Sequence, residues 1–386
     1  MFHSMRAFYL IAGLAVISGT AQAADPGVSA DKIVFGQAAA LSGPAAALGI
    51  GMRDGIQAAF AEANAKGGVK GHKLELVSKD DGYEPNRAIE VSKQLLNDDK
   101  VFALIGGVGT PTSMAVLPIT VEGNVPFIGN FTGTGGLRSP YKANVVNVRA
   151  SYGQETEAMV ERLTKDLKVE RISIFYQDDS YGQAGLAGVK AALDKRGMKL
   201  ASEGTYERNT TAVRQALLDI RKGNPQAIIM VGAYKPSAEF IKLAKQLKTE
   251  ATFVNISFVG SNALAKELGD AGTGVVVTQV VPFPEDASLP VVGAYQAALK
   301  AVPNAEIGFV SLEGYMVGRL VIMGLEKAAE PSRKALIDAL SNGTYDLGGV
   351  KLTYGANDNQ GSDDVFLTVI DKPGHLKAIK TLASQS

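Results

Sequence analysis

Residues 101–136 read VFALIGGVGTPTSMAVLPITVEGNVPFIGNFTGTGG. The stretch opens with the apolar run VFALI, whose length and composition are typical of a buried strand. A glycine-rich loop follows, then a helical pattern over residues 113–121 and a second short apolar run at residues 126–128. A strand, a helix and a strand in this order predict a βαβ unit, in which the two strands are parallel and the helix covers one face of the sheet.

The same alternation extends in both directions along the chain. Two sets of strands and helices follow one another, and the sequence has no low-complexity linker between them. We therefore predict an α/β protein with two doubly wound units, each with a parallel sheet covered by helices on both faces. Further strands are expected at residues 33–35, 74–77, 171–176, 199–201, 227–231, 253–256, 350–353 and 365–370, and further helices at residues 86–96, 212–220, 237–247, 289–301, 309–328 and 333–340.

Composition excludes several classes of function. The 386 residues include 39 Lys and Arg against 39 Asp and Glu, so neither a nucleic acid nor an anionic membrane surface is an expected partner. With no Cys and three His, the sequence excludes disulfides, thiolate zinc sites and cysteine nucleophiles, and we predict no metal site and no cofactor.

The N-terminal residues have the pattern of a secretory signal. Arg6 is the only charged residue before an uncharged run over residues 7–24, and the triplet AQA at residues 21–23 is a small-x-small cleavage signal. The apolar segment, residues 7–18, is too short to span a bilayer. We predict a signal peptide at residues 1–23 that is cleaved, and a periplasmic mature protein.

Two loops carry the best candidate ligand groups. The loop GGVGTPT, residues 106–112, lies between a strand and a helix, where backbone amides and the hydroxyls of Thr110 and Thr112 can hold a carboxylate. It lacks the pattern of a nucleotide-binding loop. The companion loop NFTGTGG, residues 130–136, follows the next strand, so both loops are expected at the carboxyl edge of one sheet, where open α/β folds bind ligands.

Catalytic motifs are missing from the sequence. It contains no G-x-S-x-G and no H-E-x-x-H, and the two histidines outside the signal, His72 and His375, lie in glycine-flanked turns. The pairs Asp80-Asp81 and Asp178-Asp179 follow predicted strands, where capping or solvation is the ordinary role of a carboxylate. We predict that the protein is not an enzyme. Aromatic side chains near strand ends suggest instead two lobes that close on a small ligand, and these are Tyr83, Phe131, Tyr152, Tyr181, Tyr234 and Phe309.

Four motifs resemble a known family. They are LSGP at residues 41–44, DDGYEP at residues 80–85, DSYG at residues 179–182 and the segment at residues 253–260. In this order they resemble the branched-chain amino-acid family of substrate-binding proteins of ABC transporters, the periplasmic leucine/isoleucine/valine-binding proteins. The similarity runs from about residue 31 to the C-terminus.

The resemblance implies a type I periplasmic binding protein: two doubly wound lobes with parallel sheets, joined by three hinge crossovers and holding the ligand between them. The crossovers are expected near residues 145–149, 279–282 and 359–362. Lobe 1 then comprises residues 24–146 and 281–360, and lobe 2 comprises residues 147–280 and 361–386. A monomer that delivers its ligand to a membrane permease is the expected state.

Family positions transfer to this chain residue by residue. The resemblance implies that Thr110 and the backbone at residues 111–112 bind the ligand carboxylate together with the loop at residues 131–133, where we favour Thr132. It assigns Tyr181 and Tyr234 to the cleft and Phe309 to the wall of the side-chain pocket. Leu48 stands where many members have Trp, and Tyr83 and Gly109 stand where the family has a disulfide.

One departure from the family bears on the ligand. The acidic residue that holds the ligand ammonium in the family corresponds to Ser257, which cannot neutralise a charge, and an unpaired buried ammonium is costly. Asp80, Asp81, Glu155, Asp178 or Asp179 are candidates to replace it. The sequence therefore favours a small carboxylate without an α-amino group, such as an aromatic acid. A branched-chain or neutral amino acid, and a ligand-sensing receptor lobe, stay open as alternatives.

Overall fold

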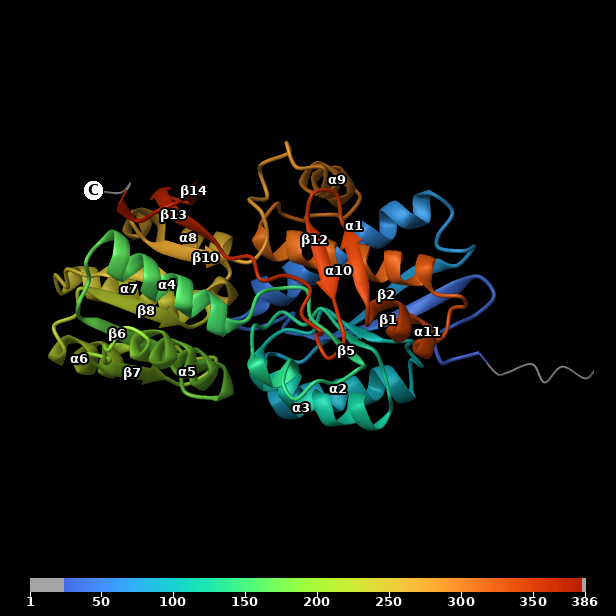
Figure 1. Cartoon of the computed structure of the whole chain (residues 1–386), viewed down its shortest axis with the longest axis horizontal. Coiled ribbons are helices and arrows are strands. Elements are labelled where there is room, and N and C mark those ends of the chain that lie inside the picture. The colour runs from blue at the N-terminus through green and yellow to red at the C-terminus, as the bar shows by residue number, and fades with distance from the viewer. Residues whose placement is uncertain (1–23, 384–386) are drawn as a thin grey trace, which may run out of the picture.

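The computed structural model describes residues 24–383, so the predicted signal peptide lies outside the described residues. Figure 1 shows two lobes side by side, and each lobe has a central sheet with helices packed against it. The two-lobed α/β fold that the sequence predicts is confirmed. No helix within the described residues is long and apolar enough to cross a membrane.

Lobe 1 contains a five-stranded sheet of order β2-β1-β3-β4-β5, in which all neighbouring strands are parallel. The long helices α1 and α10 pack against each other beside this sheet (Figure 1). The elements of lobe 1 are β1 Lys32–Ala39, α1 Ala46–Ala65, β2 Lys73–Asp80, α2 Pro85–Asn97, β3 Leu104–Ile105, α3 Thr110–Glu122, β4 Phe127–Ile128, β5 Val145–Val146, α9 Pro290–Leu299, α10 Phe309–Lys327, α11 Arg333–Leu340 and the hairpin β11 Gly343–Asp346 and β12 Lys351–Tyr354.

Lobe 2 contains a seven-stranded sheet of order β14-β13-β10-β9-β8-β6-β7. Its last two strands run antiparallel to their neighbours, β13 to β10 and β14 to β13. This sheet is therefore mixed, whereas the sequence predicts a purely parallel one. The elements of lobe 2 are α4 Tyr152–Asp166, β6 Ile172–Gln177, α5 Ser180–Asp194, β7 Glu203–Tyr206, α6 Arg214–Lys222, β8 Ala227–Val231, α7 Tyr234–Gln246, β9 Thr252–Asn255, α8 Ser261–Leu268, β10 Val276–Gln279, β13 Phe366–Lys372 and β14 His375–Ile379.

The prediction of a strand at residues 199–201 is wrong. The chain there is irregular, and the strand β7 begins at Glu203, where it pairs with β6. Gly204 is one of its two inward residues, because a Cβ atom there would lie 2.5 Å from the carbonyl oxygen of Ala216. An inward glycine breaks the apolar alternation by which the sequence reveals a strand, and the prediction therefore fell on the apolar residues before it.

Two of the connections between the lobes run side by side. The amide of Asn147 donates to the carbonyl of Asn359 at 2.8 Å, and the amide of Gly361 donates to the carbonyl of Asn147 at 2.8 Å. The hydroxyl of Tyr354 also donates to the carbonyl of Asn147 at 3.1 Å. These bonds hold two chain segments, distant in sequence, as one short ribbon at the junction.

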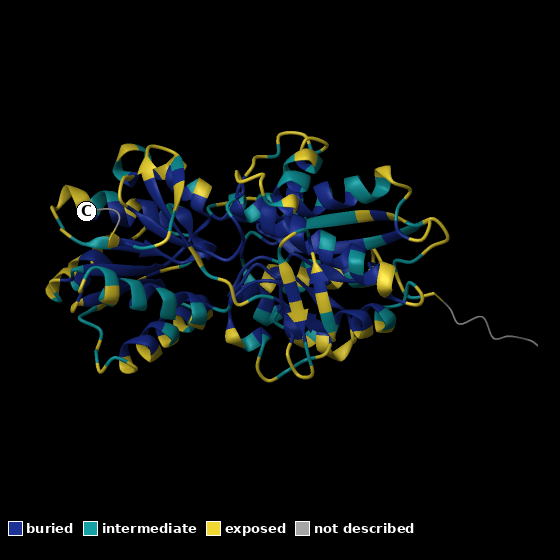
Figure 2. Ribbon diagram, turned by 45° about the horizontal axis from the view of Figure 1, so that its top comes forward, coloured by how far each residue is buried: buried dark blue, intermediate teal, exposed yellow. Residues whose placement is uncertain are grey.

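Buried residues fill the interior of both lobes and continue across the junction (Figure 2). Within lobe 1, glycines allow α1 and α10 to approach closely. A Cβ atom on Gly55 would lie 2.0 Å from the carbonyl oxygen of Ser311, and one on Gly314 would lie 2.4 Å from that of Met52. Both contacts are with backbone, which cannot rotate away as a side chain can. The position of α10, and of every side chain on it, therefore depends on these two glycines.

We expect Gly55→Ala to lower the free energy of unfolding by about 1–3 kcal/mol, because the added methyl group forces the two helices apart. Thermal unfolding followed by circular dichroism measures the effect. The control is Gly153→Ala on the exposed side of α4, where a Cβ atom meets nothing closer than 3.7 Å. An unchanged melting temperature in Gly55→Ala would contradict the close approach of α1 and α10.

Candidate functional site

The two glycine-rich loops lie where the sequence places them, at the carboxyl ends of β3 and β4. An isolated bridge between Val108 and Phe131 pairs the two loops. Gly109, with φ of +101°, directs the chain into α3, and a Cβ atom there would lie 2.2 Å from the ring of Tyr83. The loop therefore needs glycine at this position, both for its conformation and for the aromatic ring beside it.

Three hydroxyl groups from the two lobes meet at these loops. The Oγ1 atoms of Thr110 and Thr132 are 2.7 Å apart, and the Thr132 hydroxyl donates to the hydroxyl of Tyr152 at 3.3 Å. All three side chains are buried. Thr110 begins α3, so the amides of the first helical turn lie beside the hydroxyls. This arrangement matches what a carboxylate requires, which is several donors converging at one point.

Aromatic rings from both lobes form a second part of the site. Phe258 lies at its centre, with ring centroids 4.5 Å from Tyr181, 5.4 Å from Phe131 and 6.0 Å from Tyr83. Tyr152 lies 5.4 Å from Tyr181. We call these five residues the aromatic cluster. The structure thus brings together four of the aromatic residues predicted from the sequence and adds Phe258.

Three of the predicted site residues are used elsewhere. The Thr112 hydroxyl donates to the backbone carbonyls of Val108 and Gly109, within its own helical turn. The ring of Phe309 packs against Phe283 with centroids 5.7 Å apart, outside the aromatic cluster. The Tyr234 hydroxyl accepts a hydrogen bond from the amide of Ala47 at 3.4 Å, which joins lobe 2 to lobe 1.

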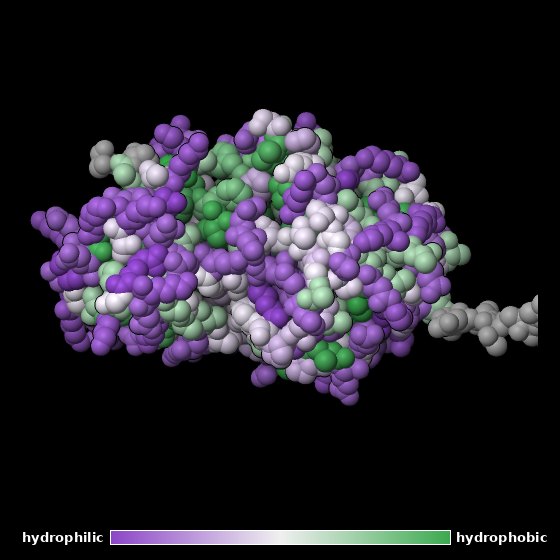
Figure 3. Space-filling model, viewed as in Figure 1, coloured by the Kyte–Doolittle hydropathy of each residue, from purple (hydrophilic) through white to green (hydrophobic). Residues whose placement is uncertain are grey.

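A pocket of about 160 Å³ lies beside these contacts at the junction of the lobes. Leu48 of α1 and Gly260, next to α8, line it together with Ile307 and Val310. On the face seen in Figure 3, hydrophobic residues gather near the junction, whereas hydrophilic residues cover most of each lobe. Leu48, at the position where many family members have Trp, therefore borders a pocket with a mixed lining, to which Asn262, Lys266 and Glu306 also contribute.

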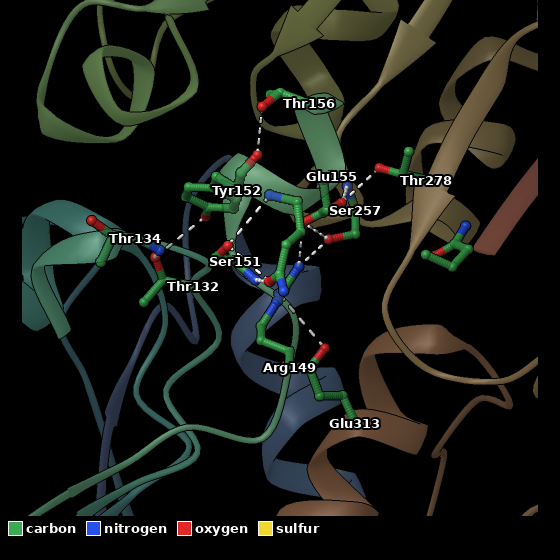
Figure 4. A network of polar contacts seen from close by, with 12 residues as sticks. Thr132, Thr134, Arg149, Ser151, Tyr152, Glu155, Thr156, Ser257, Thr278 and Glu313 are labelled. Carbon is green, nitrogen blue, oxygen red and sulfur yellow. Dashed lines mark hydrogen bonds and ion pairs between the residues drawn. The ribbon is translucent and has the colours of Figure 1, made fainter. Parts of the chain in front are cut away.

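Ser257 belongs to a buried polar network, which Figure 4 shows from close by. The carboxylate of Glu155 accepts hydrogen bonds from the amide and hydroxyl of Ser257, both at 2.9 Å, and from the hydroxyl of Thr278 at 2.6 Å. Of the five acidic residues considered from the sequence, Glu155 is therefore the one in contact with Ser257. The guanidinium of Arg149 completes the network, with Nη2 3.3 Å from a Glu155 oxygen and also bonded to the Ser257 hydroxyl.

Arg149 lies between the lobes. Its Nη1 is 3.6 Å from an Oε atom of Glu313 on α10, while Glu155 belongs to α4 of lobe 2. Its guanidinium also lies over the ring of Phe131, 4.8 Å from the centroid. Sequence reasoning did not single out Arg149, Glu313, Thr278 or Phe258. The one available signal was a charged residue, Arg149, in a crossover that the resemblance places at the hinge.

Burial and the neighbouring charges shift the pKa values of this network. Burial raises the pKa of the Glu313 carboxyl to about 7, although Arg149 acts in the opposite direction. Burial lowers the pKa of the Arg149 guanidinium, but the carboxylates of Glu313 and Glu155 more than offset this effect, so the pKa is raised. Arg149 is therefore a permanent cation, and Glu313 is the member of the network that titrates near neutral pH.

Two of the other acidic candidates, Asp80 and Asp81, stabilise turns. Hydrogen bonds from Ser42 and from the amides of Leu41 and Gly82 offset burial and lower the pKa of Asp80 to about 2. Asp81 accepts from the amide of Tyr83 at 2.8 Å, and burial raises its pKa to about 7. The partners in these bonds are Ser42, Leu41, Gly82 and Tyr83, and Ser257 is not among them.

At the rim of the site, polar contacts join the lobes. The guanidinium of Arg208 lies 2.9 Å from both Asp179 of lobe 2 and Glu84 of lobe 1. The side-chain amide of Asn209 donates to Glu84 at 2.6 Å, and that of Gln177 donates to the Tyr83 hydroxyl at 3.2 Å. With these contacts formed and the aromatic cluster packed, the structure is a closed form.

Two lobes closed over buried hydroxyls and aromatic rings define a binding protein for a small ligand. In the described part of the chain, no group of three or more His, Asp or Glu side chains is arranged to hold a metal ion. Residues 32–375 match the family model described as "Periplasmic binding protein". The chain belongs to this family, and the resemblance to the binding proteins of branched-chain amino-acid ABC transporters is confirmed.

Individual relatives agree with this assignment. A solved structure of a possible leucine/isoleucine/valine-binding protein from Rhodopirellula baltica is 40% identical, with a TM-score of 0.87 over 93% of this chain and 98% of that one. The leucine-, isoleucine-, valine-, threonine- and alanine-binding protein of Pseudomonas aeruginosa is 24% identical over 83% of this chain and 84% of its own. A solute-binding protein from R. palustris in complex with benzoate shares the fold at 20% identity, with a TM-score of 0.80 over 91% of this chain and 96% of that one.

Thr110→Val keeps the shape of the side chain and removes one of the three converging hydroxyls. A lost hydrogen bond to a charged group costs roughly 1.5–3 kcal/mol, so we expect a carboxylate ligand to bind about tenfold to a hundredfold more weakly. Titration calorimetry with that ligand measures the change. Thr112→Val is the matched control, because its hydroxyl is used within its own turn. Equal losses in the two variants would contradict the assignment of Thr110.

Proposed function

We propose that the protein captures a small carboxylate without an α-amino group, with an aromatic acid as the favoured ligand, and delivers it to an ABC permease. Lobe 1 comprises residues 24–146 and 281–360, and lobe 2 comprises residues 147–280 and 361–386. The mature protein acts as a monomer in the periplasm after removal of residues 1–23. It is not an enzyme and releases its ligand unchanged.

The observation that carries the proposal is the pairing of two kinds of surface in one site. The Thr132 hydroxyl lies 2.7 Å from that of Thr110 and 3.3 Å from that of Tyr152. These hydroxyls adjoin the aromatic cluster, of which Tyr152 is a member. Hydroxyls beside helical amides suit a carboxylate, and flat rings suit an aromatic ligand, since stacked and edge-on ring pairs are favourable. An aromatic carboxylate presents both features at once.

The polar network argues against a ligand ammonium. Four donors already occupy the two oxygens of Glu155: the amide and hydroxyl of Ser257, the hydroxyl of Thr278 and the guanidinium of Arg149. A buried ammonium would have to displace one of them. The benzoate complex from R. palustris supports the proposal to the extent that this fold accommodates an aromatic acid.

A branched-chain or neutral amino acid is the second candidate. The names of the relatives from Pseudomonas aeruginosa and Rhodopirellula baltica favour it, and so does the position of Glu155 against Ser257, which restores an acidic group near the family's ammonium site. A ligand-sensing receptor lobe is a third reading of the same fold. It would bind the same ligand without a permease.

Closure couples ligand binding to delivery. The closed form places groups of both lobes on the ligand, so a ligand that touches both lobes stabilises that form. The contacts of Arg208 and Asn209 with Glu84 stabilise the closed form further and are lost when the lobes open. A permease that recognises the closed form then receives mainly loaded protein, because the ligand adds its own contacts to those between the lobes.

A thermal-shift screen tests the ligand class. We expect benzoate-like or phenylpropanoid acids to raise the melting temperature, because a ligand that binds only the native state stabilises it. Leucine, isoleucine and valine serve as the comparison set at equal concentration. A rise with leucine or valine and none with the aromatic acids would overturn the proposal and favour the second candidate.

The pH dependence of affinity offers an independent test. Ionised Glu313 adds negative charge beside Arg149, near Glu155 and Arg138. A carboxylate should therefore bind best while Glu313 is protonated, and its affinity should fall by roughly tenfold as pH rises through about 7. Titrations between roughly pH 6 and pH 8 measure the change.

In Glu313→Gln most of the decrease should disappear, because the amide does not titrate. Any remainder is expected from Asp81, whose pKa burial also raises to about 7. The control is Glu326→Gln, an exposed position on the same helix. A zwitterionic amino acid has no net charge and should show little pH dependence in this range. A flat profile for an aromatic acid in the wild-type protein would contradict a carboxylate bound beside Glu313.

A further inference from the structure

We propose that Arg149 is the residue that selects carboxylates over amino acids: its guanidinium stands at the ammonium position of the family and donates to the ligand carboxylate. This inference rests on the proposed function and adds a specificity residue to the site. Ser257, which corresponds to the acidic residue that binds ammonium in the family, accepts a hydrogen bond from Nη2 of Arg149. The protein thus carries its own cation where the ligand of other members supplies one.

The guanidinium has donors to spare. Arg149 is fully buried at its side chain, yet its Nε and Nη1 atoms have no hydrogen-bond partner within the described residues. Nη1 lies 3.6 Å from Glu313, which is an ion pair and too long for a hydrogen bond. Buried donors without partners are costly. Because Nη2 already binds Glu155 and Ser257, the free Nε and Nη1 groups lie on different edges of the guanidinium, and each can donate one charge-assisted hydrogen bond to a ligand oxygen.

The surroundings place these donors in the site. The guanidinium lies 4.8 Å above the ring of Phe131, a member of the aromatic cluster, and Phe131 precedes Thr132 in the carboxylate loop. Figure 4 shows Arg149, Tyr152 and Thr132 in the same small region. In the proposed arrangement, a carboxylate that the threonine hydroxyls hold also meets the guanidinium, while an α-ammonium in the same place would meet a like charge.

Glu155 acts as a positioning residue in this arrangement. Its carboxylate holds Arg149 through Nη2, and Ser257 and Thr278 hold the carboxylate in turn. Removal of the guanidinium would free one acceptor position on the Glu155 oxygen that also accepts from the Ser257 hydroxyl, and another cation could take that position. The same network that binds a carboxylate would then be able to bind the ammonium of an amino acid.

The test is a change of specificity in Arg149→Met. We expect benzoate to bind at least roughly 30-fold more weakly, because one partner of a buried charge pair is lost. Leucine binding should appear or tighten in the same variant. Titration calorimetry with both compounds measures the two affinities, and circular dichroism reports whether the variant folds.

Arg149→Met leaves two buried carboxyl groups, so the double variant Arg149→Met/Glu313→Gln removes one of them and keeps the test open if the single variant unfolds. Arg149→Lys retains the charge but lacks the separate Nε and Nη donors of the guanidinium. It should keep the preference for benzoate at reduced affinity. The matched control is Arg319→Met. Arg319 lies elsewhere on α10 and pairs with Glu62 of α1, so its loss should leave both affinities unchanged.

The experiment distinguishes failure of the proposed function from failure of the role of Arg149. If the wild-type protein binds leucine and no aromatic acid, the proposed function fails, whatever the variants do. If the wild-type protein binds benzoate and the folded variants without Arg149 bind it equally well, the role of Arg149 is overturned while the proposed function stands. Loss of benzoate without a gain in leucine would support Arg149 as a carboxylate ligand and overturn its role in excluding the ammonium.

Discussion

The buried ion pair between Arg149 and Glu155 is the interaction on which the site depends. Two unit charges in a low-dielectric interior attract strongly, but their desolvation is of similar size, so such a pair persists only where further hydrogen bonds satisfy both partners. Here Ser257 and Thr278 satisfy Glu155. Arg149 is satisfied only in part, with Glu313 at 3.6 Å and two nitrogen atoms that have no hydrogen-bond partner within the described residues. These unpaired N–H groups suit a ligand that accepts hydrogen bonds, as the proposed carboxylate does.

The position of this pair follows from the connections between the lobes. Arg149 comes directly after the ribbon in which Asn147 pairs with Asn359 and Gly361, and directly before α4. A side chain at this point reaches lobe 1 through Glu313 and lobe 2 through Glu155. Arg149 therefore joins the two lobes at the point where the chain passes from one to the other.

The rest of the site is divided between the lobes, and this division gives the mechanism. The threonine hydroxyls and Phe131 belong to lobe 1, while Tyr152, Tyr181 and Phe258 belong to lobe 2. Each lobe alone offers half of the contacts. Polar contacts at the rim, such as that of Arg208 with Glu84, form between residues far apart in sequence and close the site. Under the proposed function, ligand affinity and closure would depend on the same contacts.

The sequence alone determined the class of the fold, the position of the two glycine-rich loops and the family, because these follow from local patterns: alternating strands and helices, glycines at strand ends, and short motifs in a fixed order. It also predicted the position of most of the aromatic cluster. It missed the antiparallel end of the second sheet and placed a strand at residues 199–201, since the direction of pairing and the inward Gly204 have no local apolar signal.

Only the tertiary structure decided which polar residues meet. Sequence reasoning left five acidic residues open beside Ser257, and the fold brings Glu155 to it across about a hundred residues, together with Arg149 and Thr278. The partners of a buried charge are set by packing, and packing joins positions that have no fixed spacing in the chain. For this protein, the sequence favoured a carboxylate ligand, and only the tertiary structure brought the cation Arg149 together with Glu155, Ser257 and Phe131 at the junction of the lobes.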